Sequence, residues 1–192
     1  MKRVPIIATI ILSIALLMTC KKENDTPIEP VIPCGTVVGK VLAENWKTQI
    51  PRATVFIDIN GEVYLTESDV NGNFTLQAPV GQRVLNVQTG AGRIFKTQFD
   101  VQIAKNQTTT IPSGTLKLLQ TQNLAYIVGQ YDNIQAIIVD SLGYAATEIT
   151  LLDLDNLTTM EQYGAIFLNC GKQGLLSETK YQNLLAFVQN GG

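Results

Sequence analysis

The stretch Thr66-Glu-Ser-Asp-Val-Asn-Gly-Asn-Phe-Thr-Leu76 has the pattern of a strand, a polar turn and a second strand. Its Asn71-Gly72 pair predicts a tight hairpin, because both residues tolerate the positive φ that such a turn requires. Phe74 and Leu76 alternate with polar residues, which predicts that one face of the second strand is buried. Asp69 is expected to cap the turn by accepting backbone N–H bonds. We therefore expect a β domain to be built outward from this stretch.

The same alternation continues on both sides and predicts an all-β domain over residues 35–120. A second pair, Asn60-Gly61, is expected to close a two-residue hairpin turn. Turn signals recur about every ten residues, a spacing typical of β-sandwiches rather than of strand–helix–strand units. The other alternating segments begin at Val37, Val55, Val84, Phe99 and Leu116.

Four motifs, taken in order, resemble the carboxypeptidase regulatory-like domain. They are Val37-x-Gly39-x-Val41, Pro51-x-Ala53-x-Val55, Asp69-x-x-Gly72-x-Phe74 and Pro79-x-Gly81. That family has a transthyretin-like β-sandwich fold. The resemblance implies an all-β, seven-stranded sandwich that contributes no catalysis of its own.

From Asn123 onward the pattern changes, and residues 123–192 predict an incomplete α/β domain. The run Leu124-Ala-Tyr-Ile-Val128 is apolar throughout, which is typical of a strand covered on both faces. Two further strands are expected at residues 148–152 and 165–169. Alternating strands and helices predict a parallel sheet with right-handed crossovers and the strand order 2-1-3. Residues 165–169 would then form an apolar edge, so we expect the polypeptide either to be a fragment or to complete its sheet with another chain.

Two helices are predicted in this segment. Asp132 is expected to cap the first, which ends at Gly143, and Ser177 the second, which ends at Asn190-Gly191. The apolar side chains expected on the inner side are Ile134, Ile137, Ile138 and Leu142 in the first helix and Tyr181, Leu184, Leu185 and Val188 in the second.

This segment also resembles the first half of a class I glutamine amidotransferase-like (flavodoxin-like) domain. The resemblance rests on Tyr126-Ile-Val-Gly129, on Leu142-Gly143-Tyr144 and on the run from Tyr163 to Gly171. In catalytic members of that family the nucleophile follows the next strand, which here would lie beyond residue 192. Cys170 is therefore not matched to the nucleophile of the family.

A ligand crevice is predicted at the carboxyl ends of the parallel strands. Open parallel sheets bind ligands there, at the point where the strand order reverses. Gln130, Asp132, Cys170 and Lys172 are expected to rim this crevice. The alternative for Cys170 is a small buried residue that ends a strand, since cysteines outside disulfides are often buried.

Residues 1–20 have the pattern of a targeting signal. A basic start precedes the apolar run Ile6–Met18, which is shorter than the roughly 20 residues that a transmembrane helix needs. Leu17-Met18-Thr19-Cys20 resembles the lipobox of bacterial lipoproteins, although that family usually has Gly, Ala or Ser where Thr19 stands. The resemblance implies a membrane anchor through acylation of Cys20. An uncleaved anchor and an ordinary secretory signal are the alternatives.

Residues 21–34 are predicted to form a tether, because Pro27, Pro30 and Pro33 favour extended backbone and apolar residues are few. Lys21-Lys22-Glu23 resembles the signal that sends some Gram-negative lipoproteins to the outer face of the outer membrane. We therefore expect a lipid-anchored, surface-exposed outer-membrane protein, or else one on the periplasmic face. The alternative for this charged run is a solvated spacer.

Composition excludes several classes of function. The 14 basic and 16 acidic residues give no electrostatic basis for binding nucleic acid. These 192 residues contain no histidine, which excludes a Ser-His or Cys-His nucleophile pair and histidine-ligated zinc within them. We expect neither a cofactor nor a metal.

The sequence thus predicts a membrane-anchored lipoprotein, a non-catalytic binding or spacer module at the bacterial cell envelope. The alternative is the N-terminal part of a cell-surface hydrolase or amidotransferase-like enzyme whose catalytic residues lie beyond residue 192. A carbohydrate-binding sandwich is a third candidate, but Trp46 and Tyr64 are too few aromatic residues to support it. The sequence does not specify a ligand.

Overall fold

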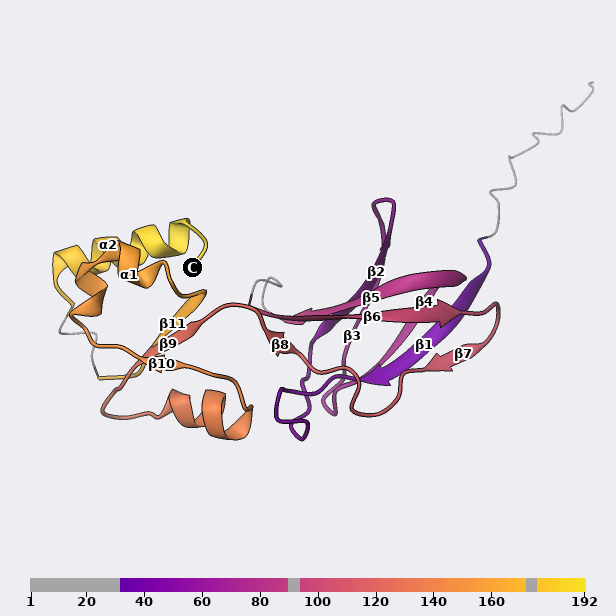
Figure 1. Ribbon diagram of the computed structural model, residues 1–192, viewed down its shortest axis with the longest axis horizontal. Coiled ribbons are helices and arrows are strands. Elements are labelled where there is room, and N and C mark those ends of the chain that lie inside the picture. Colours follow the sequence, from indigo (N-terminus) through magenta and orange to yellow (C-terminus); the bar gives the residue numbers. More distant parts are fainter. Residues whose placement is uncertain (1–31, 90–93, 172–175) are drawn as a thin grey trace, which may run out of the picture. The chain divides into compact units, whose positions relative to one another are not determined.

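Two facing β-sheets make up the first part of the computed structural model, which describes residues 32–89, 94–171 and 176–192 (Figure 1). One sheet has the order β4-β1-β7 and the other the order β3-β2-β5-β6-β8. The strands are β1 (Cys34–Lys40), β2 (Thr54–Ile59), β3 (Glu62–Glu67), β4 (Asn73–Pro79), β5 (Gly81–Thr89), β6 (Phe95–Ile103), β7 (Thr108–Thr110) and β8 (Leu119–Gln120). The predicted all-β sandwich is confirmed. In the described residues it has three plus five strands rather than seven, because the short β8 joins the larger sheet.

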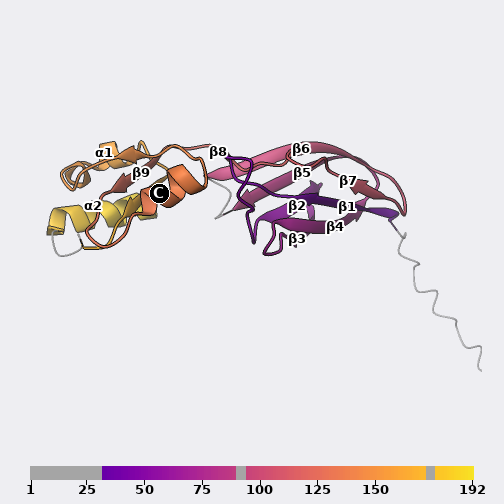
Figure 2. The same cartoon turned by 90° about the horizontal axis from the view of Figure 1, so that it is seen from below.

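The core of the sandwich is formed by apolar side chains that alternate along the strands. Figure 2 shows the two layers of strands that enclose it. Val37 from the smaller sheet and Val55, Ile57 and Leu85 from the larger one are buried in one cluster. Burying a side chain of this size contributes about 1.5–3 kcal/mol. The period-2 pattern in the sequence therefore decides which face of each strand is covered.

The Asn60-Gly61 turn is the tight hairpin of this fold. Ile59 and Glu62 are paired across it, and φ is +55° at Asn60 and +91° at Gly61. Positive φ at both central residues is what a type I′ turn requires. The predicted two-residue turn is therefore confirmed.

The hairpin expected at Asn71-Gly72 is wrong, because β3 and β4 belong to different sheets and the stretch between them crosses the sandwich. Gly72 does take positive φ, at +77°, but Asn71 does not. Asp69 accepts hydrogen bonds from the backbone N–H groups of Asn71 and Asn73, each at 2.8 Å, so its predicted capping role is confirmed.

A three-stranded parallel sheet forms the core of the second segment, with the order β10-β9-β11. Its elements are β9 (Leu124–Ile127), the helical turn η2 (Ala136–Ser141), β10 (Thr147–Glu148), η3 (Asp153–Asp155), α1 (Leu157–Met160), β11 (Ala165–Leu168) and α2 (Glu178–Gln189). The helices α1 and α2 cover one face of this sheet and η2 the other (Figure 1). The parallel order 2-1-3 is as predicted, whereas the likeness to an amidotransferase stays a prediction.

Several expected boundaries and faces in this segment are wrong. The second strand is Thr147–Glu148 rather than residues 148–152, because the chain turns into η3. Asn133, not Asp132, caps the first helical segment by accepting a bond from the N–H of Ala136 at 3.1 Å. Ser177 does cap α2 as predicted. The residues expected on the inner side but found exposed are Ile137, Tyr181, Leu185 and Val188.

The sandwich and the parallel sheet share a hydrophobic cluster. Tyr144 is buried there beside Phe95, with ring centroids 4.4 Å apart, and its hydroxyl donates to the carbonyl of Leu118 at 3.1 Å. Asn45 of the sandwich donates through Nδ2 to the carbonyl of Ser141 at 2.7 Å. Residues Ile32–Gly192 therefore form one compact unit.

Part of the predicted organisation lies outside the described residues. This applies to the signal peptide, to Cys20, to most of the tether and to Lys172. In the portion of the chain that the structure describes, no helix combines the length and apolarity needed to cross a bilayer.

Candidate functional site

The carboxyl ends of β9 and β11 lie side by side and bring three predicted site residues together. The backbone N–H of Gln130 donates to the carbonyl of Cys170 at 2.9 Å. The backbone N–H of Cys170 donates to Asp132 Oδ1 at 2.7 Å. These contacts bring Gln130, Asp132 and Cys170 together at the carboxyl ends of the two parallel strands, where the ligand crevice is predicted.

Gly129 allows the two strand ends to approach so closely. A side chain at this position would place its Cβ 2.5 Å from the carbonyl oxygen of Cys170 and 2.6 Å from Cβ of Asn169. Both contacts are far inside the van der Waals separation of 3.5–4.0 Å, so any larger residue would force the strands apart. Gly129 is thus needed for the backbone bonds that define the crevice.

Asn169, which sequence reasoning missed, is the buried residue between β11 and Cys170. Its side chain is 0% exposed, and Nδ2 donates to Gln135 Oε1 at 2.8 Å. Oδ1 of Asn169 is buried and accepts no hydrogen bond from the described residues. A buried acceptor without a donor destabilises the folded state by about 1–3 kcal/mol. The sequence offers one signal that could have identified Asn169. It is a polar residue directly after the apolar run 165–168, at the end of a strand next to which the strand order reverses.

Tyr131 and Cys170 present the exposed surface of the crevice. Tyr131 is 80% exposed, and its ring passes so close to Gly171 that an added Cβ there would lie 3.1 Å from Cδ2 of the ring. Cys170 is exposed as well. The interpretation of Cys170 as a buried residue is therefore wrong, and its thiol belongs to the rim.

A shallow groove of about 240 Å³ adjoins the crevice and shares Gln135 with it. Tyr126, Asn133 and Asp140 also line this groove. Burial and the nearby Glu148 carboxylate raise the pKa of the Tyr126 phenol, so the hydroxyl remains a neutral hydrogen-bond donor and acceptor. The groove therefore offers amide, hydroxyl and carboxylate groups for hydrogen bonding.

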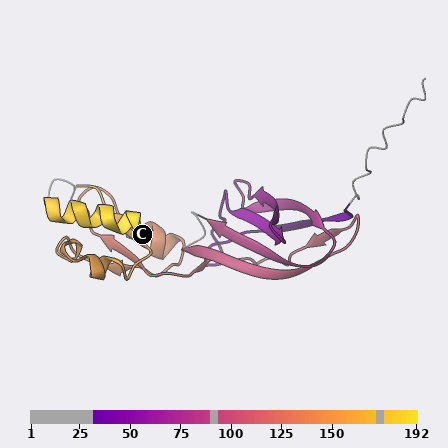
Figure 3. The same ribbon diagram turned by 90° about the horizontal axis from the view of Figure 1, so that it is seen from above.

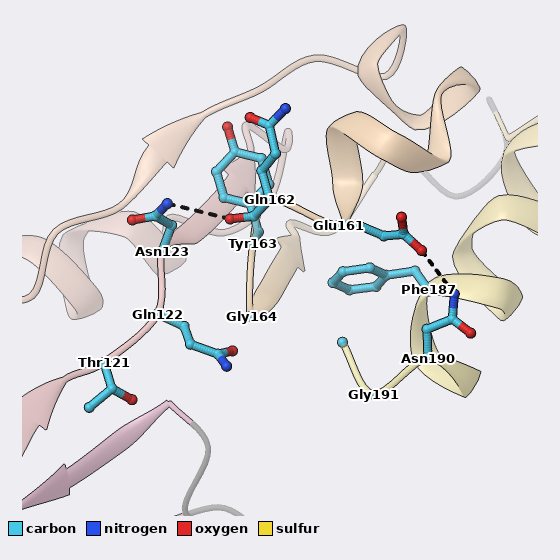
Figure 4. Close-up of a pocket in the computed structure, with 11 residues that line it drawn as sticks. Thr121, Gln122, Asn123, Glu161, Gln162, Tyr163, Gly164, Phe187, Asn190 and Gly191 are labelled. Carbon is cyan, nitrogen blue, oxygen red and sulfur yellow. Dashed lines mark hydrogen bonds between the residues drawn. The ribbon is translucent and has the colours of Figure 1, made fainter.

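A larger cavity, of about 520 Å³, lies at the opposite end of the parallel sheet (Figure 4). Asn123 and Glu161 line it, and Phe187 of α2 projects toward it. The Glu161 carboxylate already accepts a bond from Asn190 Nδ2 at 2.9 Å. Ligands of open parallel sheets bind at the carboxyl ends of the strands, whereas this cavity is at their amino ends. We therefore keep the candidate site at the carboxyl ends of β9 and β11, beside the groove of about 240 Å³.

These 192 residues supply no histidine that could activate the Cys170 thiol as a nucleophile. A cysteine nucleophile needs a neighbouring base that takes its proton. The chain contains no histidine, and the Asp132 carboxylate is engaged with the backbone N–H of Cys170. In the described ranges, no three metal-ligating side chains gather into a cluster that could hold an ion.

No protein-family model and no curated protein sequence matches the chain. Several solved structures share part of its backbone. One is the 5-hydroxyisourate hydrolase of Klebsiella pneumoniae, with 18% identity over 46% of this chain and 99% of that one, at a TM-score of 0.32. Another is a DUF3823 family protein of Parabacteroides merdae, with 13% identity over 46% and 47% of the two chains, at a TM-score of 0.34.

A third similar structure is a cohesin–X-dockerin complex of Acetivibrio cellulolyticus. Its identity to this chain is 11%, over 58% of this chain and 88% of that one, at a TM-score of 0.37. The chain spans less than half of the Parabacteroides merdae structure. None of these three likenesses assigns a function to the chain.

Proposed function

We propose that the chain is a membrane-anchored, non-catalytic binding protein of the bacterial cell envelope. In this proposal the sandwich is a rigid spacer, and the crevice at the carboxyl ends of β9 and β11 binds the ligand. The observation that carries the proposal is the buried Oδ1 of Asn169, which accepts no hydrogen bond from the described residues and lies next to the exposed Cys170. Buried polar groups of this kind are rare in folded proteins, and binding a donor is one reason to retain them.

The chemistry of the crevice limits the class of ligand. Asp132 supplies an exposed carboxylate acceptor and Tyr131 an exposed aromatic face, whereas the buried Oδ1 of Asn169 becomes an acceptor only when the residues above it move aside. A small polar ligand with N–H or O–H donors fits this set of groups. A strongly anionic ligand does not fit, because Asp132 would repel it.

Membrane anchoring rests on the N-terminal sequence. The lipobox-like run at Leu17–Cys20 and the proline-rich residues after it support a lipid anchor and a tether. Two or three acyl chains give stable anchoring, since each buried CH₂ contributes about 0.8 kcal/mol.

Anchoring is tested with the full chain in a Gram-negative host, by labelling with a fatty-acid analogue and fractionating the membranes. The wild-type chain should carry the label and sediment with the outer membrane. Cys20→Ser should carry none and leave that fraction, while the matched variant Cys34→Ser should behave as wild type. Label retained by Cys20→Ser contradicts the anchor.

Binding is tested by nuclear magnetic resonance with neutral monosaccharides and free amino acids as probes. One class should shift the side-chain amide resonances of Asn169 and the backbone amides of Gln130 and Tyr131. Resonances of Asn123, at the other end of the sheet, are the internal control and should not move. Shifts confined to Asn123 and its neighbours would place the site at the larger cavity instead.

A further inference from the structure

Trp46 lies in the loop between β1 and β2 and combines exposure with a strained backbone. The residue is 50% exposed, and its φ is +62°. Positive φ is an outlier for a bulky residue, and such strain concentrates at ligand-binding and catalytic sites. An exposed aromatic ring that is held in a strained conformation is a candidate contact for a ligand.

Asn45 holds this loop in place. Its Oδ1 accepts hydrogen bonds from the backbone N–H groups of Lys47 and Thr48, both at 2.9 Å. Its Nδ2 donates to Thr48 Oγ1 at 2.9 Å and to the carbonyl of Ser141, at the end of η2, at 2.7 Å. These contacts fix the loop at both of its sides, so the positive φ of Trp46 is maintained by its surroundings.

One face of the indole ring rests on the segment that follows β7. Lys117 Nζ lies over the ring, 4.6 Å from its centroid. An added Cβ at Gly114 would lie 3.7 Å from Cε3 of the ring, an ordinary van der Waals distance. Because both neighbours belong to residues 114–117, they support the ring from one side. The exposed part of Trp46 is therefore the opposite face of the ring, which is open to a ligand.

Polar groups continue from the ring into a groove. Glu44 Oε1 lies 4.0 Å from Lys117 Nζ, and Glu44 also lines a groove of about 380 Å³. Gln120 and Gly143 belong to the wall of this groove, beside the connection from the sandwich to the parallel sheet (Figure 3). Its volume is within the range of about 300–1,000 Å³ that small-molecule sites occupy. The ring, the Glu44–Lys117 ion pair and the groove are therefore neighbours, and together we call them the Trp46 surface.

We propose that the Trp46 surface binds a neutral oligosaccharide, with one pyranose ring over Trp46 and the next in the groove. A pyranose has an apolar face of C–H groups, which packs on an exposed aromatic ring, and a rim of hydroxyls that both donate and accept hydrogen bonds. The Glu44 carboxylate accepts from such hydroxyls and the Lys117 ammonium donates to them. This site is separate from the crevice at the carboxyl ends of β9 and β11, and it goes beyond the function proposed above.

The groups of the Trp46 surface select a neutral ligand rich in hydroxyls. Glu44 repels anions and Lys117 repels cations, so neither class of ion is favoured. Single-stranded nucleic acid also stacks on tryptophan, but it needs a basic groove, and Lys117 is paired with Glu44. Grooves for proline-rich peptides are lined by aromatic residues, whereas no aromatic side chain lines this groove in the described part of the chain. Counting aromatic residues in the sequence does not support a sugar site, because only the structure shows the polar groups beside Trp46.

The test is tryptophan fluorescence of the full chain, because its 192 residues contain one tryptophan and the emission therefore reports the Trp46 surface alone. Maltotriose, cellotriose and xylotriose are the probes, each up to about 50 mM, and at least one should change the emission with a Kd on the order of 1 mM. Glucose reaches the ring without the groove and should bind at least about tenfold more weakly. Sorbitol, an open-chain polyol, is the control and should leave the emission unchanged.

Three variants locate the binding. Glu44→Gln should weaken it at least about fivefold, since a charged acceptor and the ion pair with Lys117 are lost. Asp100→Asn makes the same change at an exposed carboxylate of β6 and should bind as wild type does. Trp46→Gly removes the ring and suits positive φ, so it should fold, which circular dichroism verifies, and should lose the probe-induced shift of the Gly143 amide resonance.

Several outcomes overturn the proposal. One is an emission that none of the three trisaccharides changes, and another is an equal change with sorbitol, which marks a solvent effect. Binding that is as tight in Glu44→Gln as in the wild type overturns it too, as does a Gly143 shift that Trp46→Gly retains. Emission that responds only to hexaproline assigns the surface to a peptide and likewise overturns it.

Reporter resonances keep this proposal apart from the other sites. A trisaccharide that shifts the amides of Gln130 and Tyr131 without changing the emission binds at the crevice, which supports the function proposed above and overturns the present inference. Gly143 is the reporter of the groove because it lines the groove and not the larger cavity, whereas Asn123 lines both.

Discussion

The Tyr144 hydroxyl, in the second segment, donates a hydrogen bond of 3.1 Å to the carbonyl of Leu118 at the end of the sandwich. Both residues are buried, and Phe95 packs against the Tyr144 ring. The Leu118 carbonyl of the sandwich thus receives its hydrogen bond from the Tyr144 side chain of the second segment. This contact makes the two predicted segments depend on each other for stability.

Tyr144→Phe should therefore destabilise the unit Ile32–Gly192 by about 1–2 kcal/mol, because the buried Leu118 carbonyl loses a donor. Urea unfolding followed by circular dichroism measures the change. Tyr126→Phe is the control, since its hydroxyl makes only an exposed contact of 3.4 Å with Glu148, and it should change stability by less than about 0.5 kcal/mol. Equal losses of stability in the two variants would show that the buried Tyr144 hydrogen bond stabilises the fold no more than the exposed Tyr126 contact does.

Alkaline pH should weaken the wild-type unit through the same residue. Burial, aided by the Glu44 carboxylate, raises the pKa of Tyr144 from 10.0 to about 12. Between these two pKa values Tyr144 stays protonated in the folded state but loses its proton in the unfolded state. The contribution of Tyr144 to the free energy of unfolding is therefore complete below pH 10 and is lost as pH rises toward 12. The stability difference between wild type and Tyr144→Phe should shrink across this window. A constant difference from pH 8 to pH 11 would argue against a perturbed Tyr144.

Gly72 and Gly61 offer a matched pair for separating backbone strain from steric clash. Both have positive φ, but a Cβ at Gly61 meets no atom within 4 Å, whereas one at Gly72 would lie 2.7 Å from the Val41 carbonyl oxygen. Gly61→Val should lower stability by about 1–2 kcal/mol through strain alone. Gly72→Val should lower it by at least about 1 kcal/mol more, because backbone must move. Thermal unfolding of both variants tests this prediction. Equal losses of stability would mean that the backbone at Val41 can move away from the new Cβ without destabilising the fold.

The sequence predicted correctly those features, such as a tight turn and a helix cap, that depend on residues adjacent in the chain. The Asn60-Gly61 turn joins strands that pair directly, and Ser177 caps α2 from the preceding position. Asn71-Gly72 carries the same local signal, yet its flanking strands pair with distant partners in separate sheets. The same dipeptide has positive φ at both residues in Asn60-Gly61 but only at the glycine in Asn71-Gly72, so it determines neither the full turn conformation nor the strand partners.

Burial was harder to predict than element type. The sequence marks Tyr181, Leu185 and Val188 as apolar, but their exposure depends on which side of α2 meets η3 and α1. The closeness of Gln130, Asp132 and Cys170 could be predicted because parallel strands bring their carboxyl ends together, whereas their role as a ligand site stays a prediction. Asn169 was missed, since only the packed structure reveals that its side-chain amide oxygen is buried and accepts no hydrogen bond from the described residues.

Asn169→Leu tests the candidate site most directly, because stability and binding should move in opposite directions. Leucine has a similar size and removes the buried, unpaired Oδ1, while Gln135 is only partly buried and can bond to solvent instead. The unit should therefore gain about 1 kcal/mol of stability, or at least lose none, and should no longer bind the probe that shifts the wild-type Asn169 resonances. Asn123→Leu is the control and should leave that binding unchanged. A loss of more than about 2 kcal/mol in Asn169→Leu would show that the amide stabilises the fold, and retained probe binding would remove Asn169 from the site.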